Sequence, residues 1–470
     1  MDSTTQSSNQ TPNEMLTELA AASGCSKGDL LVMAPRNDPF NTGTPTDIEL
    51  AEWFGGIWKR LNPPSKIHIR KVHYTLVSME NPPLKPDGLP YENTDECWQL
   101  LQAASRKARY LGTVAADAFS DNRNPKPLIY AAEPHEPDVP SWQIEEFEDF
   151  HLPEIQSNLS FWIDLPGITV DGYDYDAGDQ PYHLEVWPEK TTMNDELIPL
   201  CEEYGVNLAS SAGFASITSA VNLLQRIEGL IRMNRPARIF YISDFDPAGL
   251  SMPRQVSRQL EFWLWKYGIK ADIKLQPLML TAEQVKKYKL PRTPIKDSDK
   301  RKGAFEDLHG EGAVELDAMD AIHPGEFTRI VEAEIRKYRD ESLEEMIGET
   351  KYEVTSDVET DWEIAIDETQ STVNEISDEV DGIVSKYRPQ LAALNKALQA
   401  ELAPLRERLE EDEGNIRAEV RRAAGELYLQ MPPRPEAEIE PPDESNWLFD
   451  ASRGFREQVN FYNQHKSGDL

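Results

Sequence analysis

The sequence predicts an α/β protein whose central part is a parallel sheet with helices packed on it. In residues 181–345, short apolar segments alternate with longer segments that have apolar residues at helical spacing. This alternation is typical of parallel strands joined by right-handed crossover helices. At 470 residues and 39% hydrophobic residues, the chain can bury a core. The expected strands are YHLEVW (182–187), VNLAS (206–210), ARIFYIS (237–243) and ADIKLQPLML (271–280).

Residues 46–133 precede the sheet and are expected to form a mainly helical domain. The segment DIELAEWFGGIWKRL has helical spacing and stops before Pro63, and TDECWQLLQAASRKARYLG ends near Gly112. IHIRKVHYTLVS lies between them. A helix, a short helix, a helix and a β-like tail follow the order of a winged-helix (CAP-like) domain. Cations gather in this part of the chain: Lys66, Arg70, Lys71, Arg106, Lys107 and Arg109.

The other segments show weaker patterns. Residues 1–45 are expected to be disordered or partly helical, with one short helix at NEMLTELAAAS. Residues 134–180 are acidic and proline-bearing, as in a linker. Residues 346–430 combine an acidic insert with a long helical segment that Pro404 is expected to break or kink. Residues 431–470 are expected to be a Pro- and Glu-rich tail.

The net charge of −35 is the most extreme bulk property. A solvated acidic surface explains it, and so does a basic partner; taken alone, it argues against a nucleic-acid ligand. A local basic groove remains compatible with it. No apolar run is long enough for a membrane span, and the N-terminal residues lack a secretion-signal pattern. Three widely separated cysteines fit a reducing compartment, so the sequence predicts a cytoplasmic protein without a membrane partner.

Acidic residues follow two of the expected strands. Asp244 and Asp246 come after ARIFYIS and precede a turn through Pro247 and Gly249, and Glu189 follows YHLEVW. Ligands of open α/β sheets gather at the carboxyl ends of strands, so these acids share one edge if the two strands are neighbours. Three carboxylates there suit Mg²⁺. Asp-x-Asp alone is a weak signal in a chain with 83 acids, but its place between strand, turn and helix favours a metal site.

These motifs resemble the Toprim domain, a Rossmann-like metal-binding fold, and more narrowly the topoisomerase VI A subunit and the meiotic double-strand-break protein family. The family's Glu-Lys pair is matched by Glu189-Lys190, and its Asp-x-Asp-Pro-x-Gly motif by residues 244–249. Residues 280–291 and the segment AVELDAM, which contains Glu315, extend the resemblance across residues 180–340. The chain departs from the family at Pro188, where the family tends to have Val. The acidic insert and the helical C-terminal extension have no counterpart.

The resemblance also implies a tyrosine nucleophile in an Arg-x-x-x-Tyr motif of the winged-helix domain, which Arg70 and Tyr74 match. A phenol with a pKa near 10 is both a usable nucleophile and a fair leaving group. Arg70 lies one helical turn before Tyr74, where it could steady the phosphate. The alternative is a core aromatic at Tyr74 beside a surface cation. His73 replaces the first tyrosine of the family's aromatic pair. It could act as a base or serve only in packing, and packing is the favoured role.

The resemblance implies Mg²⁺-dependent cleavage of double-stranded DNA, with Tyr74 linked to a 5′ phosphate. It also implies a homodimer in which one chain's tyrosine works with the other chain's metal. The cations that could line the DNA channel are Arg70, Lys71, Arg106, Arg109 and those of residues 296–302. No P-loop signature occurs, so strand passage would need a separate ATPase subunit. Two other functions also fit the sequence: a Toprim nuclease that uses metal-activated water, and a non-catalytic relative that binds DNA or a partner.

Overall fold

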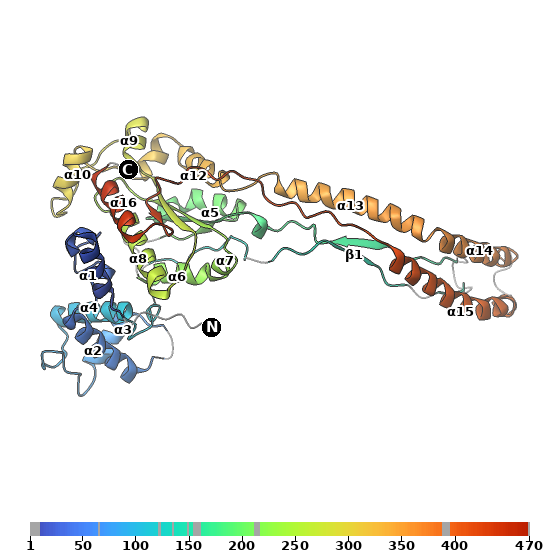
Figure 1. Cartoon of the computed structure of the whole chain (residues 1–470), viewed down its shortest axis with the longest axis horizontal. Helices are drawn as coiled ribbons and strands as arrows, with labels where there is room; N and C mark the ends of the chain where they lie inside the picture. Colours follow the sequence, from blue (N-terminus) through green and yellow to red (C-terminus); the bar gives the residue numbers. More distant parts are fainter. Residues whose placement is uncertain are drawn as a thin grey trace. The chain divides into compact units, whose positions relative to one another are not determined.

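The chain divides into two compact units in the computed structural model (Figure 1). The first unit comprises Met1–Pro134, Gln180–Asp340 and Ile439–Leu470, and the second comprises His135–Asp179 and Glu341–Glu438. The structure describes residues 10–63, 66–120, 124–133, 136–147, 150–153, 161–210, 217–387 and 395–468.

A five-stranded sheet forms the centre of the first unit, with the strand order β4-β3-β5-β6-β7. The first four of these strands are parallel, and β7 pairs with β6 in the antiparallel direction. The α/β class and the parallel pairing predicted from the sequence are therefore confirmed. The strands are β3 (His183–Pro188), β4 (Asn207–Leu208), β5 (Ala237–Ile242), β6 (Ile273–Met279) and β7 (Phe449–Asp450).

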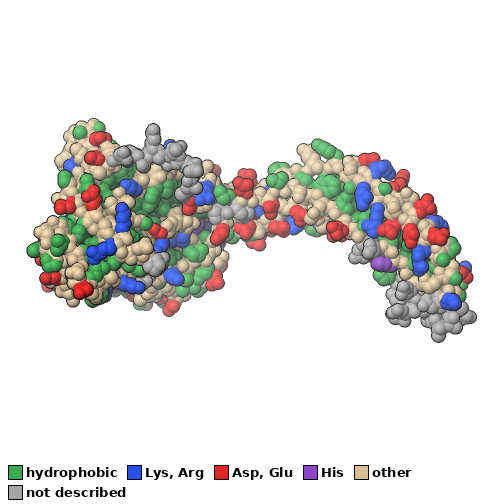
Figure 2. All heavy atoms as spheres, turned by 90° about the horizontal axis from the view of Figure 1, so that it is seen from below, with side chains coloured by type: hydrophobic (Ala, Val, Ile, Leu, Met, Phe, Trp, Pro, Cys, Tyr) green, Lys and Arg blue, Asp and Glu red, His purple; other side chains and the backbone are tan. Residues whose placement is uncertain are grey.

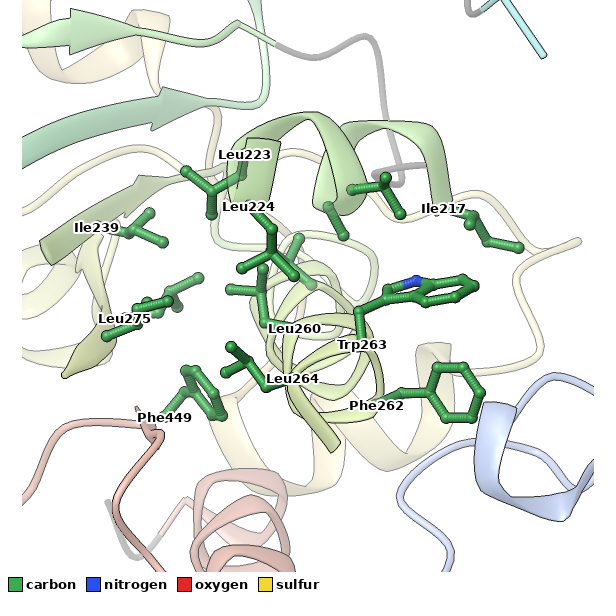
Figure 3. Close-up of a cluster of buried hydrophobic side chains, with 14 of the residues drawn as sticks. Ile217, Leu223, Leu224, Ile239, Leu260, Phe262, Trp263, Leu264, Leu275 and Phe449 are labelled. Carbon is green, nitrogen blue, oxygen red and sulfur yellow. The ribbon is translucent and has the colours of Figure 1, made fainter. Parts of the chain in front are cut away.

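Helices cover both faces of this sheet. Ile239 of β5 faces a cluster that includes Leu224 and Leu260, shown in Figure 3, whereas Phe240 faces a second cluster with Leu197 and Val331. Successive residues of a strand point to opposite faces, so both faces of β5 are apolar and buried, as in a parallel sheet. The helices of this part are α5 (Asn194–Glu203), α6 (Ile217–Arg226), α7 (Glu228–Arg232), α8 (Met252–Tyr267), α9 (Ala282–Tyr288), α10 (Lys302–His309), α11 (Asp317–Ile322), α12 (Glu326–Arg336) and α16 (Phe455–Ser467), with the 3₁₀ turn η4 (Thr191–Met193).

Three helices before the sheet share a separate core. Helices α2, α3 and α4 enclose Phe54, Val72 and Leu101, which are inaccessible to solvent. Single β-bridges join Ile67 to Phe119 and Leu84 to Pro90. The helices follow the expected order. Among the described residues of this region, no β-ladder is longer than a single bridge. The elements are α1 (Pro12–Ser23), η1 (Lys27–Leu30), η2 (Pro39–Asn41), α2 (Pro45–Leu61), α3 (Ile69–Val77) and α4 (Asp95–Leu111).

The chain ends contribute more to the first unit than their composition suggests. The expected N-terminal helix forms as α1, and its Leu16 packs in the same cluster as Phe40 on one face of the sheet. Residues 431–470, expected to be a tail, supply strand β7 and helix α16. Phe449 of β7 is buried in that same cluster, so the C-terminal residues complete the sheet and its core.

The second unit combines a two-stranded antiparallel sheet with three long helices. Strands β1 (Ser141–Ile144) and β2 (Ile168–Asp171) lie in the segment expected to be a linker. Apolar residues at spacings of three and four line the facing sides of α14 and α15, which is the pattern of a coiled-coil pair. Of the two expectations at Pro404, the break is wrong, because α15 continues through it, and the kink stays a prediction. The elements are η3 (Ala177–Asp179), α13 (Leu343–Ala365), α14 (Asp367–Val384) and α15 (Asn395–Glu426).

The acidic insert forms helix surface in this second unit. Val354, Val358 and Trp362 of α13 are buried in one core cluster, and Val373 and Val380 of α14 are buried in another. The carboxylates occupy the remaining faces, and Figure 2 shows acidic side chains together with basic ones along the surface that it draws. Across the described parts of the chain, every helix is too short or too polar to cross a bilayer.

Candidate functional site

The ends of β3 and β5 bring acidic residues from two distant segments together. Pro188 pairs with Ile242 in the parallel register, and the Glu189 N–H then donates to the Ile242 carbonyl at 2.7 Å. The Glu189 carboxylate accepts a hydrogen bond of 3.2 Å from the Asp244 N–H. The expectation that these strands are neighbours and share an acidic edge is therefore confirmed.

The turn after β5 is held by Asp246. Its Oδ1 accepts hydrogen bonds from the N–H groups of Ala248, at 2.8 Å, and Gly249, at 2.6 Å. An aspartate that binds the backbone two and three residues ahead is a common way to close a tight turn before a helix. Gly249 comes so close to the preceding strand end that an added Cβ would lie 2.0 Å from the Asp244 carbonyl oxygen. The turn geometry that places both aspartates therefore requires glycine at this position.

We expect Gly249→Ala to lower the free energy of unfolding by about 2 kcal/mol or more, because the backbone of Asp244 must move to admit the methyl group. Gly56→Ala is the matched control, since a Cβ at Gly56 meets nothing within 4 Å. Denaturant titration of both variants measures the effect. Equal stability of the two variants would show that the turn is not tightly packed.

Lys190 lies among the acids and pairs with several of them. Its Nζ is 2.7 Å from Asp244 Oδ2 and 3.5 Å from Asp317 Oδ2, and it also donates to the Glu315 carboxylate. The segment containing Glu315 is held in place because Val314 exchanges two backbone hydrogen bonds with Phe245. The sequence motifs matched Lys190 and Glu315 to the family but did not indicate that the two pair with each other.

Asp244 is the most enclosed member of this cluster. It is only 4% exposed, and its Oδ1 accepts a hydrogen bond of 2.8 Å from the Leu316 N–H. Burial raises the pKa of Asp244, although the hydrogen bonds from Lys190 and Leu316 oppose this effect. Burial lowers the pKa of Lys190, but its hydrogen bonds to Asp244 and Glu315 outweigh burial, and the net shift is upward. The Lys190 ammonium is therefore stabilised by its carboxylate partners, whereas burial disfavours the charged form of Asp244.

Glu189 carries a carboxyl group of this edge whose pKa is strongly raised. Burial, followed by the charge of Asp244 and more weakly that of Asp246, raises the pKa of Glu189 to about 7. The Asp244 N–H and Lys190 reduce this shift without cancelling it. The shift therefore reflects first the burial of this carboxyl group and second the negative charge beside it.

The raised pKa predicts how stability depends on pH in metal-free protein. The folded state retains the Glu189 proton up to a pH of about 7, whereas the unfolded chain has a pKa near 4.5. The folded state thus binds more protons between these values, and this group's contribution to stability falls as the pH rises from 4.5 to 7. Glu189→Gln should remove that fall, so its melting temperature should gain on the wild type more at pH 8 than at pH 5. Thermal melts in EDTA check this; a pH-independent difference would contradict it.

The carboxylate oxygens at this edge are suitable ligands for a hard divalent cation. The Lys190 ammonium, however, already contacts Asp244, so such a cation would compete with it for this carboxylate. Among the described residues, no group of three or more His, Cys, Asp or Glu side chains is spaced to hold a metal ion. Both carboxylate oxygens of Asp244 already have partners, Lys190 and the Leu316 N–H. For Glu189, Asp244 and Asp246 to hold a metal ion together, the Lys190 ammonium would have to leave Asp244 and the three carboxylates would have to take a different spacing.

Tyr74 lies on the open face of the short helix α3. Its side chain is 59% exposed, so the alternative of a core aromatic is wrong. Arg70, one turn earlier, is also exposed. His73 is buried, and its ring nitrogens lie 2.7 Å from the Tyr91 hydroxyl and 3.2 Å from Asn93 Oδ1, in agreement with a packing role. In the parts of the chain that the structure describes, no hydrogen bond, ion pair or ring contact joins Tyr74 to the acidic edge.

The three residues expected to contact DNA have different surroundings. Lys71 is exposed on α3. Arg106 and Arg109 of α4 instead line one cavity together. Arg106 donates to Asn37 Oδ1 at 3.4 Å, and Arg109 donates to Thr218 at 3.5 Å while its guanidinium carbon lies 5.1 Å from the centre of the Phe119 ring.

Two of the four cations of residues 296–302 are paired within their own segment. Arg301 contacts Asp299 at 2.8 Å, and Lys302 contacts Asp297 at 2.7 Å. These contacts reduce the net positive charge that this stretch can offer to DNA. Arg301 nevertheless lines the same cavity as Arg106 and Arg109.

Together, the fold and this edge define an α/β unit with an acidic cluster at the carboxyl ends of adjacent parallel strands. No protein-family model matches the chain, and none of the curated proteins is significantly similar to it.

Proposed function

We propose that the chain is a Mg²⁺-dependent DNA-cleaving protein of the topoisomerase VI A type, with Tyr74 as its nucleophile. The observation that carries the proposal is the placement of Glu189 beside Asp244 and Asp246 at one edge of the sheet. Perturbed acids at the carboxyl ends of neighbouring parallel strands are candidates for a functional site. The segment of Glu315, which is part of the resemblance, lies against the same edge.

The domain assignments of this proposal extend the α/β class. We propose that the sheet and its helices, from residue 181 to 345, are a Toprim domain, which the order and pairing of β3, β5 and β6 support. We propose that residues 46–133 are a winged-helix domain. The three helices with a common core support this assignment, as does the Ile67–Phe119 bridge, which joins the segment before α3 to the segment after α4.

In the proposed reaction, the phenolic oxygen of Tyr74 attacks a backbone phosphorus. A bond forms between that oxygen and phosphorus, the bond from phosphorus to the 3′ oxygen breaks, and the 3′ oxygen leaves with a proton taken from water. The phenol proton passes to solvent, to which the exposed ring has direct access. Arg70 lies where it could bind a non-bridging phosphate oxygen. A divalent cation bound at the acidic edge would supply charge neutralisation for the phosphate.

The proposal includes a homodimer in which the tyrosine of one chain meets the acidic edge of another. The lack of a contact between Tyr74 and Glu189, Asp244 or Asp246 within the described part of one chain is compatible with such an arrangement. Two tyrosines acting on opposite strands would produce a double-strand break. Complete topoisomerase activity would depend on a separate ATPase subunit.

A second candidate is a Toprim nuclease that uses metal-activated water. The same separation between Tyr74 and the acidic edge favours it, because this reaction needs no nucleophile from α3. The two candidates differ in their products. Purified protein is incubated with supercoiled plasmid and Mg²⁺ and quenched with detergent. Protein covalently bound to DNA supports the tyrosine reaction, broken DNA without bound protein supports the nuclease, and intact plasmid contradicts both.

A further inference from the structure

A cavity of about 570 Å³ in the first unit is lined by four arginines, and none of its described lining residues is acidic. Its walls come from α4, from the start of α8, from residues 32–37 and from the segment before α10. The arginines are Arg106, Arg109, Arg254 and Arg301. The chain has a net charge of −35, but this cavity has four cations and no carboxylate among its described lining residues. Its local positive charge would attract an anion.

Arg254 is the least compensated of the four. It lies in the first turn of α8, is half-buried, and forms no hydrogen bond or ion pair among the described residues. Burial lowers the pKa of Arg254 to about 10. Burial and then the charge of Arg254 lower the pKa of His465, on α16, to about 3. A charged group removed from water without a partner costs free energy that a bound anion would recover.

Arg301 connects this cavity to the acidic edge. Its guanidinium donates to the Ser251 hydroxyl at 3.1 Å, two residues beyond the Gly249 turn. Hydrogen bonding to Asp299 and, more weakly, the charge of Asp246 raise the pKa of Arg301. The cavity therefore opens beside the turn that carries Asp246, within the same unit.

We infer that this four-arginine cavity binds a phosphate group. Guanidinium groups bind phosphate oxygens through paired, charge-assisted hydrogen bonds, and several arginines around one space match the several oxygens of a phosphate. The phosphate belongs to a DNA backbone if the proposed function holds, and this assignment of its source rests on that function. A small phosphate compound offers the same chemistry, so the test includes both sources.

The test measures binding to the full chain in EDTA, where no metal-dependent cleavage can occur. The probes are inorganic pyrophosphate, followed by calorimetry, and a fluorescent DNA duplex, followed by anisotropy. We expect Arg254→Gln to weaken binding of at least one probe by about tenfold or more, because a charged hydrogen-bond donor is lost. Arg254→Lys should recover part of the loss. The matched control is Arg232→Gln, an exposed arginine of α7 outside the cavity that pairs with Glu228 at 2.6 Å.

The two probes together show which source of phosphate the cavity binds. Weaker binding of the duplex with unchanged pyrophosphate binding assigns the cavity to a DNA backbone, and the reverse assigns it to a small phosphate compound; a loss of both assigns it to phosphate in general. Unchanged binding of both probes overturns the inference. Arg106→Gln, on α4 instead of α8, repeats the test independently if Arg254→Gln lowers the melting temperature. Because the assay needs neither Tyr74 nor a metal, the cavity can be confirmed while DNA cleavage fails, or the reverse.

Discussion

Tyr74→Phe is expected to abolish covalent protein–DNA complexes, with a loss of at least about 100-fold relative to the wild type. Removing the hydroxyl eliminates the attacking atom and leaves the exposed ring in place, so folding should be unaffected. The measurement is detergent-quenched cleavage of supercoiled plasmid in Mg²⁺, with bound protein detected on the DNA ends.

Tyr352→Phe is the matched control for this experiment. Tyr352 is also an exposed tyrosine, 76% accessible on α13 of the second unit, and has no role in the proposed reaction. Its variant should keep full activity. Covalent complexes that persist in Tyr74→Phe would refute the assignment of the nucleophile. If the variant still breaks DNA strands but forms no covalent complexes, the result would support the nuclease that uses metal-activated water.

Asp244→Asn is expected to reduce Mg²⁺-dependent cleavage by at least about 100-fold and to abolish the rise in melting temperature that a divalent cation produces. The amide keeps an oxygen that can accept the Leu316 N–H, so the backbone contact survives. The negative charge is lost from the most buried position of the acidic edge. Plasmid cleavage and thermal melts with and without Mg²⁺ measure the two effects.

Asp317→Asn separates metal binding from simple pairing with Lys190. Asp317 also approaches Lys190, at 3.5 Å, but it is half-exposed and lies outside the three proposed ligands. This control should retain both cleavage and the cation-dependent stabilisation. Equal losses in the two variants would show that Lys190, rather than a metal ligand set, is what cleavage requires.

The sheet was largely predictable because its strands carry local signals. Segments such as ARIFYIS are short, apolar and rich in β-branched and aromatic residues, and they form β3, β5 and β6 as expected. Strand β7 was missed because it has only two residues, Phe449 and Asp450, and follows a proline-rich stretch. Its place is fixed by pairing with Lys274 and Leu275 of β6, a long-range contact that local sequence does not encode.

Part of the candidate site could also be predicted from the sequence, and part could not. The shared edge of Glu189 and Asp244 followed from strand alternation, because parallel neighbours end at the same side of a sheet. The ion pairs of Lys190 did not follow, since Glu315 lies 125 residues further along the chain. The continuation of α15 through Pro404 was also missed. A proline costs a helix one hydrogen bond, but packing of Leu402 and Leu405 against α14 stabilises both sides of it.

Lys190 gives the acidic strand ends an internal counterion. Its ammonium already offsets part of their mutual repulsion, so the chain can assemble this corner of the fold before it acquires any metal. The proposed uptake of a divalent ion would then be an exchange of one cation for another. Such an exchange would leave the lysine with its outer partners, Glu315 and Asp317, and metal affinity would depend on how firmly those two acids retain it.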